Sequence, residues 1–273
     1  MISPDLATDH RAQYEEAGYI FPIRVMDTDE AQRLAARVEK YAQDESINPY
    51  LSGDAHLVFQ FVDELVRRKV VLDAVEAALG PDIMLLRAGF FIKPPHSSGH
   101  VSWHQDLTYW GLDQDEEVTA WIAFNPATEA NGCMRFVSGT HRHGIVEHVD
   151  TTDADNLLTR SQVIKVQVNE SDAIPVVLAA GEMSLHHGQI YHASGPNSTD
   201  GWRIGLAARY VTPRMQQVVG SKDYATLVRG EDNYGHFEAP PRPSSDLDPV
   251  ALAYFNQAKE AKKEFLYQGQ EQG

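Results

Sequence analysis

The chain has 273 residues, 42% of them hydrophobic, which is enough to bury the core of one large domain or two small ones. Its 23 Lys and Arg against 39 Asp and Glu give a formal net charge of −16, which disfavours nucleic acids and anionic membranes as partners. No stretch approaches the roughly 18 to 20 apolar residues of a membrane span, and the first residues lack a signal-peptide pattern. Cys133 is the single cysteine and has no disulfide partner within the chain. We therefore expect a cytoplasmic globular protein.

The first part of the chain has the periodicity of helices. One helical pattern covers residues 9–45 with a turn at Gly18, and a second covers residues 58–79 and ends at Gly80-Pro81. We expect these N-terminal helices, over about residues 9–79, to cover a sheet.

From about residue 80 the pattern changes to short apolar runs separated by loops rich in Pro, Gly, Asn, Ser and Asp. The predicted strands are residues 83–93, 118–124, 133–137, 163–168, 174–178, 183–187 and 204–211. Many short strands without alternating helices predict an antiparallel sandwich or jelly roll over about residues 80–212. A C-terminal extension with a helix over 249–265 completes a single domain, 1–273, that is mainly β with flanking helices.

A candidate metal site lies in the segment Ser102-Trp103-His104-Gln105-Asp106. On a strand or its extended end, residues i and i+2 point the same way, so His104 and Asp106 face one point. His192 is the candidate for a third ligand from a distant strand. Two histidines and one carboxylate leave positions open for a bidentate acid and dioxygen. By itself, the His-x-Asp pattern is weak because surface loops produce it by chance.

Arg203 makes the pattern more specific, because it follows His192 by eleven residues on the next predicted strand. If the chain turns back between them, Arg203 enters the barrel beside the metal. Its planar guanidinium then holds a carboxylate by two parallel hydrogen bonds. A dicarboxylate would chelate the metal at one end and meet Arg203 at the other.

Other histidines compete for the role of ligand. His186 and His187 precede His192, but their distance from the arginine does not fit the eleven-residue step. His141 and His143 form another i, i+2 pair in a predicted solvated loop. We therefore favour His192, with a zinc site built on the other histidines as the alternative.

A series of short motifs, densest over residues 90–210, carries a family resemblance. The motifs are Ile92-Lys93-Pro94-Pro95, His104-Gln105-Asp106-Leu107-Thr108-Tyr109-Trp110, Ala120-Trp121-Ile122-Ala123, Asn131-Gly132-Cys133-Met134, Ser138-Gly139-Thr140-His141, Gly181-Glu182-Met183 and His192-Ala193-Ser194-Gly195-Pro196-Asn197, closing at Arg203. The series, within roughly residues 10–212, resembles the phytanoyl-CoA dioxygenase (PhyH) family of Fe(II)/2-oxoglutarate-dependent oxygenases.

The resemblance implies a cofactor, a fold and site residues. It implies a double-stranded β-helix, the cupin-like form of the jelly roll, with Fe(II) as the metal and 2-oxoglutarate and O2 as co-substrates. The implied iron ligands are His104, Asp106 and His192, and the implied 2-oxoglutarate contacts are Arg203, Ser194, Trp121 and Gln105. Because the part beyond Pro213 does not match the acyl-CoA-processing members, we expect hydroxylation of a small free metabolite, with a CoA thioester as the alternative.

Rival functions differ in which residues they need. Halogenation is disfavoured because Asp106 occupies the position that a halide would take. A zinc-dependent hydrolase or a non-catalytic jelly-roll binding protein would have no use for Arg203. Arg87, Lys93 and Arg135 lie on predicted strands, and each fits contact with an anionic substrate group or a surface charge equally well. One sequence does not predict the oligomeric state.

Overall fold

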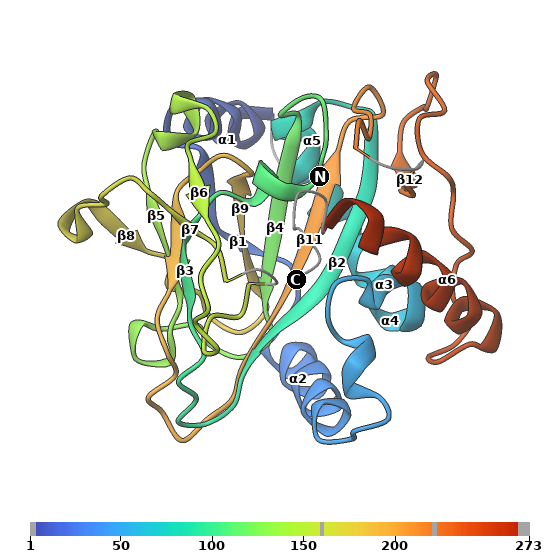
Figure 1. The fold of residues 1–273 in the computed structure, drawn as a ribbon, viewed down its shortest axis with the longest axis horizontal. Coiled ribbons are helices and arrows are strands. Elements are labelled where there is room, and N and C mark those ends of the chain that lie inside the picture. The colour runs from blue at the N-terminus through green and yellow to red at the C-terminus, as the bar shows by residue number, and fades with distance from the viewer. Residues whose placement is uncertain (1–3, 159–160, 220–222, 267–273) are drawn as a thin grey trace.

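The computed structural model describes residues 4–158, 161–219 and 223–266, and within them two antiparallel sheets face each other (Figure 1). The larger sheet has the order β1 (Tyr19–Arg24), β9 (Glu182–His187), β4 (Glu117–Ala123), β11 (Arg203–Val211), β2 (Ile83–Lys93) and β12 (Thr226–Arg229). The smaller sheet has the order β3 (Val101–His104), β10 (His192–Ser194), β5 (Met134–Val137) and β8 (Ala173–Pro175). Strands β6 (His148–Val149) and β7 (Val163–Ile164) pair separately.

Helices cover the side of the larger sheet that faces away from the smaller sheet. They are α1 (Pro4–Ala17), α2 (Thr28–Ala42), α3 (Ala55–Val58), α4 (Gln60–Val66), α5 (Lys69–Leu79) and α6 (Pro249–Leu266). In Figure 1, α3, α4 and most of α6 lie to the right of β2, α2 lies below them, and β3, β5 and β8 of the smaller sheet lie to the left of β4. Helix α2 begins with the Asp27 side chain accepting a hydrogen bond from the Glu30 amide, and α5 ends at Gly80, whose φ of 90° suits glycine.

The two faces of the larger sheet carry different side chains. On β11, Ile204, Leu206 and Ala208 are buried in the main hydrophobic core with the helices. Arg203 and Arg209 alternate with them and line a pocket on the other face. Because successive side chains of a strand point to opposite faces, packing against helices on one side directs the polar residues toward the smaller sheet.

The predicted class, mainly β with flanking helices and a jelly-roll core, is confirmed. Several boundaries agree closely, as β2 and α6 show. Residues 19–24, expected within a helical segment, instead form the edge strand β1. Pro22 cannot continue a helix, and it lies where the register with β9 shifts between Ile20 and Ile23, a position that an edge strand tolerates.

Two further differences concern the helices before residue 80 and the C-terminal extension. The helix expected over residues 58–79 is divided into α3, α4 and α5, and Phe59 is extended between the first two. The C-terminal extension contributes β12 to the edge of the larger sheet beside β2. Among the described residues, no helix has both the length and the hydropathy needed to cross a membrane.

Candidate metal centre

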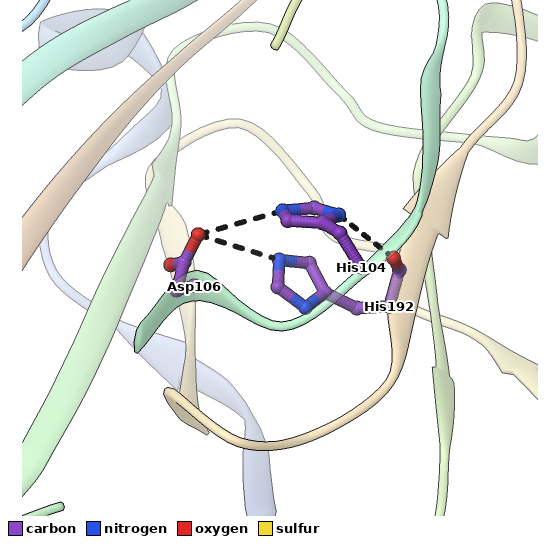
Figure 2. A group of neighbouring side chains, drawn as sticks. All are labelled: His104, Asp106 and His192. Atoms are coloured by element: carbon purple, nitrogen blue, oxygen red, sulfur yellow. Dashed lines mark hydrogen bonds and ion pairs between the residues drawn. The ribbon is translucent and has the colours of Figure 1, made fainter. Parts of the chain in front are cut away.

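His104, Asp106 and His192 converge between the two sheets. His104 ends β3, Asp106 begins the 3-10 turn η2 (Asp106–Tyr109), and His192 begins β10 directly opposite His104. Figure 2 shows both imidazoles turned toward the carboxylate. Oδ1 of Asp106 lies 3.4 Å from Nε2 of His104 and 3.9 Å from Nε2 of His192. Each residue offers a ligand atom within 4.8 Å of the others, and no second such group occurs within the described ranges.

The backbone fixes which ring nitrogen faces the centre. Nδ1 of His104 lies 2.9 Å from the Ser102 carbonyl and 3.1 Å from the His192 carbonyl, and Nδ1 of His192 lies 3.0 Å from the Ile190 carbonyl. A carbonyl only accepts hydrogen bonds, so each Nδ1 carries a hydrogen, and in the neutral ring Nε2 is then the nitrogen with the lone pair. Both imidazoles thus present a metal-binding nitrogen toward Asp106.

The protonation states of the buried groups suit a cation. Burial, followed by the neighbouring His104 and His186, lowers the pKa of His192 well below its ordinary value, so this ring is neutral. Burial opposes ionisation of Asp106, but the charge of Arg209, followed by the neighbouring His104, His186 and His192, holds its pKa well below the usual range. Two imidazoles and one carboxylate form a donor set that divalent iron accepts.

The second oxygen of Asp106 is held from the larger sheet. Oδ2 accepts a hydrogen bond of 3.1 Å from the Thr119 hydroxyl. Nε2 of His186 and Nε of Arg209 each lie 3.8 Å from the same oxygen. These contacts orient the carboxylate so that Oδ1 faces the two ligand histidines.

Two buried cations lie in and beside the same pocket, because Arg203 lines it and Lys93 is hydrogen-bonded to Ser194, which also lines it. Arg203 and Lys93 stand directly opposite each other on β11 and β2, with exposed fractions of 2% and 0%. The Lys93 ammonium donates to the Ser194 hydroxyl at 2.7 Å and to the Gly195 carbonyl. The Arg203 guanidinium lies 4.3 Å from the centre of the Trp121 ring.

No carboxylate of the described chain forms an ion pair with either cation, and Nε of Arg203 lacks a hydrogen-bond partner there. Like charges directly opposite in a sheet are destabilising. Burial, followed by repulsion from Arg203, lowers the pKa of Lys93 to about 7, and burial lowers the pKa of Arg203 to about 10. The pair therefore fits an anion that the protein itself does not supply.

The structure brings together nearly all of the predicted site residues. The pocket is lined by His104, Asp106, His192, Ser194, Trp121 and Arg203. Gln105 is the exception, because alternation turns it away from its two neighbours. Its amide donates to the Gly144 and Gln189 carbonyls at 2.8 and 2.7 Å, and its oxygen accepts from the Val146 amide at 2.9 Å. Gln105 therefore holds the surrounding loops and does not line the pocket.

The competing histidines lie in different places. His186 is buried in the pocket beside Asp106, whereas His187 points to the opposite face and its ring centre lies 5.2 Å from that of His141. Burial, followed by His141, lowers the pKa of His187 to about 4. His141 thus belongs to a packing cluster outside the metal centre.

The prediction from sequence did not name Thr119 or Arg209, considered His186 only as a competing ligand, and left Lys93 undecided. Arg209 follows Arg203 by an even number of residues on one strand, so strand alternation placed it on the same face. Of the other cations, Arg87 pairs with Asp223, and Arg135 is partly exposed and pairs with Glu170.

Comparison with known proteins agrees with this geometry. The family model for phytanoyl-CoA dioxygenase (PhyH) matches residues 14–205. A probable alpha-ketoglutarate-dependent hypophosphite dioxygenase of Stutzerimonas stutzeri is 29% identical over 171 residues, which cover 62% of this chain and 59% of that protein. The peroxisomal phytanoyl-CoA dioxygenase of Mus musculus is 26% identical over 230 residues, which cover 75% of this chain and 68% of that protein.

Solved structures have the same fold. The apo form of ThoJ, described as a non-heme monooxygenase, superposes with a TM-score of 0.84 at 34% identity, covering 95% of this chain and 98% of that one. CytC3 with Fe(II) and alpha-ketoglutarate has a TM-score of 0.67 at 24% identity, covering 91% and 96%, and shows the fold. Because the family model matches well over half of the residues, the chain belongs to the phytanoyl-CoA dioxygenase (PhyH) family.

Proposed function

We propose that this protein hydroxylates a C–H bond of a small free metabolite, using Fe(II), 2-oxoglutarate and O2 and releasing succinate and CO2. The enzyme class, a 2-oxoglutarate-dependent oxygenase, is confirmed by family membership. The substrate, the bond that is attacked and the role of each residue are the proposal.

The observation that carries the proposal is the combination of two features in and beside one pocket. Three side chains that line the pocket present metal-binding atoms to a common point. Arg203, which also lines the pocket, and Lys93 are buried side by side without a carboxylate partner among the described residues. A ligand that chelates a metal at one end and carries a negative charge at the other satisfies both. 2-Oxoglutarate has this chemistry, with a keto acid at one end and a second carboxylate at the other.

Each residue then has a defined role. His104, Asp106 and His192 would hold Fe(II) through the atoms that already face one another. Arg203 and Lys93 would hold the distal carboxylate by charge-assisted hydrogen bonds, and Trp121 supports the guanidinium through its ring face. With 2-oxoglutarate and O2, Fe(II) supplies the oxidant, one oxygen atom entering succinate and the other the new hydroxyl group.

Space for a substrate lies next to this pocket. A cavity of about 510 Å³ shares Phe91 and Arg209 with the pocket of the metal centre. Cavities of this size bind small molecules, which supports a metabolite as the substrate.

The test is O2-dependent conversion of 2-oxoglutarate to succinate by the Fe(II)-loaded protein, followed with and without candidate metabolites. We expect conversion in the parent and in His141→Ala, and none in Asp106→Ala. Turnover of a hydrolysable substrate by the zinc-loaded protein without 2-oxoglutarate or O2 would contradict the proposal.

A further inference from the structure

The cavity next to the metal centre is lined by residues that hold neither the metal nor 2-oxoglutarate in the proposed function. Its apolar wall includes Leu51, Ile92, Phe91 and Trp110. Arg209 lies at the boundary, because it lines both this cavity and the pocket of the metal centre. We call this space the outer cavity.

The Arg209 guanidinium lies beside two aromatic rings and has no hydrogen bond to a carboxylate of the described residues. Its guanidinium carbon lies 5.7 Å from the Phe91 ring centre and 5.4 Å from the Trp110 ring centre. Its side chain is 13% exposed, and its Nε is buried with no hydrogen-bond partner in the described structure. Its nearest carboxylate oxygen is Oδ2 of Asp106 at 3.8 Å, beyond hydrogen-bond distance.

Arg87, the other arginine in the wall, shows the contrast. It stands opposite Arg209 on β2, and its guanidinium donates to the Asp223 carboxylate. It also donates to the Leu86 carbonyl at 2.6 Å and to the Tyr224 carbonyl at 2.8 Å. Arg87 is therefore satisfied by the protein, whereas Arg209 keeps its donors for a ligand.

The charges around Arg209 also favour an anionic ligand. In the proposed function, Asp106 shares its charge with a divalent ion and no longer neutralises Arg209. A buried guanidinium without a counter-charge is costly, and an anion entering the outer cavity removes that cost.

We propose that the outer cavity binds the primary substrate as a small organic anion, with its carboxylate or phosphate group on Arg209 and its apolar part against Leu51 and Ile92. The inference rests on the proposed function and adds the chemical class of the substrate. Because Arg209 is adjacent to Asp106, the anionic group lies beside the metal centre. The C–H bond nearest that group is then the one presented for hydroxylation.

The test compares a carboxylate with its neutral amide of the same shape, and adds a phosphate of similar size. The compounds are 3-phenylpropanoate, its amide 3-phenylpropanamide, and phenyl phosphate, each titrated calorimetrically into protein loaded with Mn(II) and 2-oxoglutarate without O2. The broadening of the compounds' proton resonances by Mn(II) locates them relative to the metal. We expect at least one anion to bind about 10-fold or more tightly than the amide. For 3-phenylpropanoate, we expect the protons beside the carboxylate to broaden most.

Two variants assign the preference to Arg209. Arg209→Met should abolish the preference for the anion and Arg209→Lys should keep part of it, while Arg135→Met, which removes a partly exposed arginine of β5, should change nothing. Normal Mn(II) and 2-oxoglutarate binding with equal affinity for anions and amide, or an unchanged preference in Arg209→Met, would overturn this inference. Failure of the parent to bind Mn(II) would overturn the proposed function instead.

Discussion

The hydroxyl of Thr119 lies 3.1 Å from Oδ2 of Asp106 and 2.8 Å from Oε1 of Glu117, and so links a candidate metal ligand to a second buried acid. Thr119 occupies β4 of the larger sheet, whereas Asp106 follows β3 of the smaller one. The contact therefore fixes the carboxylate across the gap between the two sheets.

Replacing Thr119 with the isosteric valine should weaken metal binding. Thr119→Val removes the hydrogen bond that orients Asp106, and the loss of such a supporting contact reduces metal affinity by about 10- to 100-fold. Titration with Co(II) measures the change. Thr226→Val, the same substitution on β12 of the same sheet, is the control, and an equal affinity in both variants would contradict the assigned role.

Glu117 should affect metal binding by donating a hydrogen bond from its protonated carboxyl group to Thr119. The Thr119 hydroxyl has one hydrogen for two neighbouring carboxyl groups, so it donates to Asp106 only if Glu117 donates to it. Glu117→Gln keeps a donor and should retain the Co(II) affinity of the parent, whereas Glu117→Leu should lower it. If both variants bind Co(II) equally well, the link is structural and does not orient the ligand.

The affinity for 2-oxoglutarate should fall as the pH rises through 7. Lys93 is charged below its lowered pKa of about 7 and neutral above it, and the dicarboxylate binds better to the charged form. Binding should also raise this pKa and take up protons. Calorimetry on both sides of that pKa, in buffers of different ionisation enthalpy, measures both effects.

Lys93→Met separates this effect from titration of the metal ligands. The variant should lose the part of the pH dependence that belongs to the lysine and bind 2-oxoglutarate more weakly at low pH. Lys165→Met, which removes an exposed lysine, is the control. An identical pH profile in Lys93→Met and the parent would remove Lys93 from the co-substrate site.

Gly205 should be required for the position of Arg203. A Cβ atom on Gly205 would lie 1.8 Å from Cζ2 of Trp121, whose ring supports the Arg203 guanidinium. Gly205→Ala should therefore displace the indole and weaken 2-oxoglutarate binding by about 10-fold, while metal content is kept. Gly201→Ala is the control, because nothing lies within 4 Å of its added Cβ. Unchanged 2-oxoglutarate affinity in Gly205→Ala would contradict the support role of Trp121.

The convergence of His104, Asp106 and His192 could be predicted because part of it depends on spacing along the chain. His104 and Asp106 are two residues apart on extended chain, and His192 precedes Arg203 by the one loop that joins β10 of the smaller sheet to β11 of the larger sheet. The jelly roll could be predicted because short apolar runs separated by turn residues are also visible along the sequence. β1 was missed because its six residues lie between two helical patterns and were included in that helical segment, although Pro22 cannot continue a helix.

The remaining site residues depend on pairing between strands that are far apart in sequence. Lys93 becomes a partner of Arg203 only through the register of β2 and β11, which no local pattern specifies. Thr119 and His186 likewise meet Asp106 only because β4 and β9 lie side by side. Gln105 was placed in the site because the family resemblance carried it there, although strand alternation turned its side chain away.

Anaerobic titration of the Fe(II)-loaded protein with 2-oxoglutarate tests the central claim most directly, because the chelate has a visible metal-to-ligand charge-transfer band. We expect the band to develop in the parent and in His141→Ala and to be absent in His192→Ala. The absence of a band in the iron-loaded parent, or an unchanged band in His192→Ala, would contradict the assignment of this pocket as the iron and 2-oxoglutarate site.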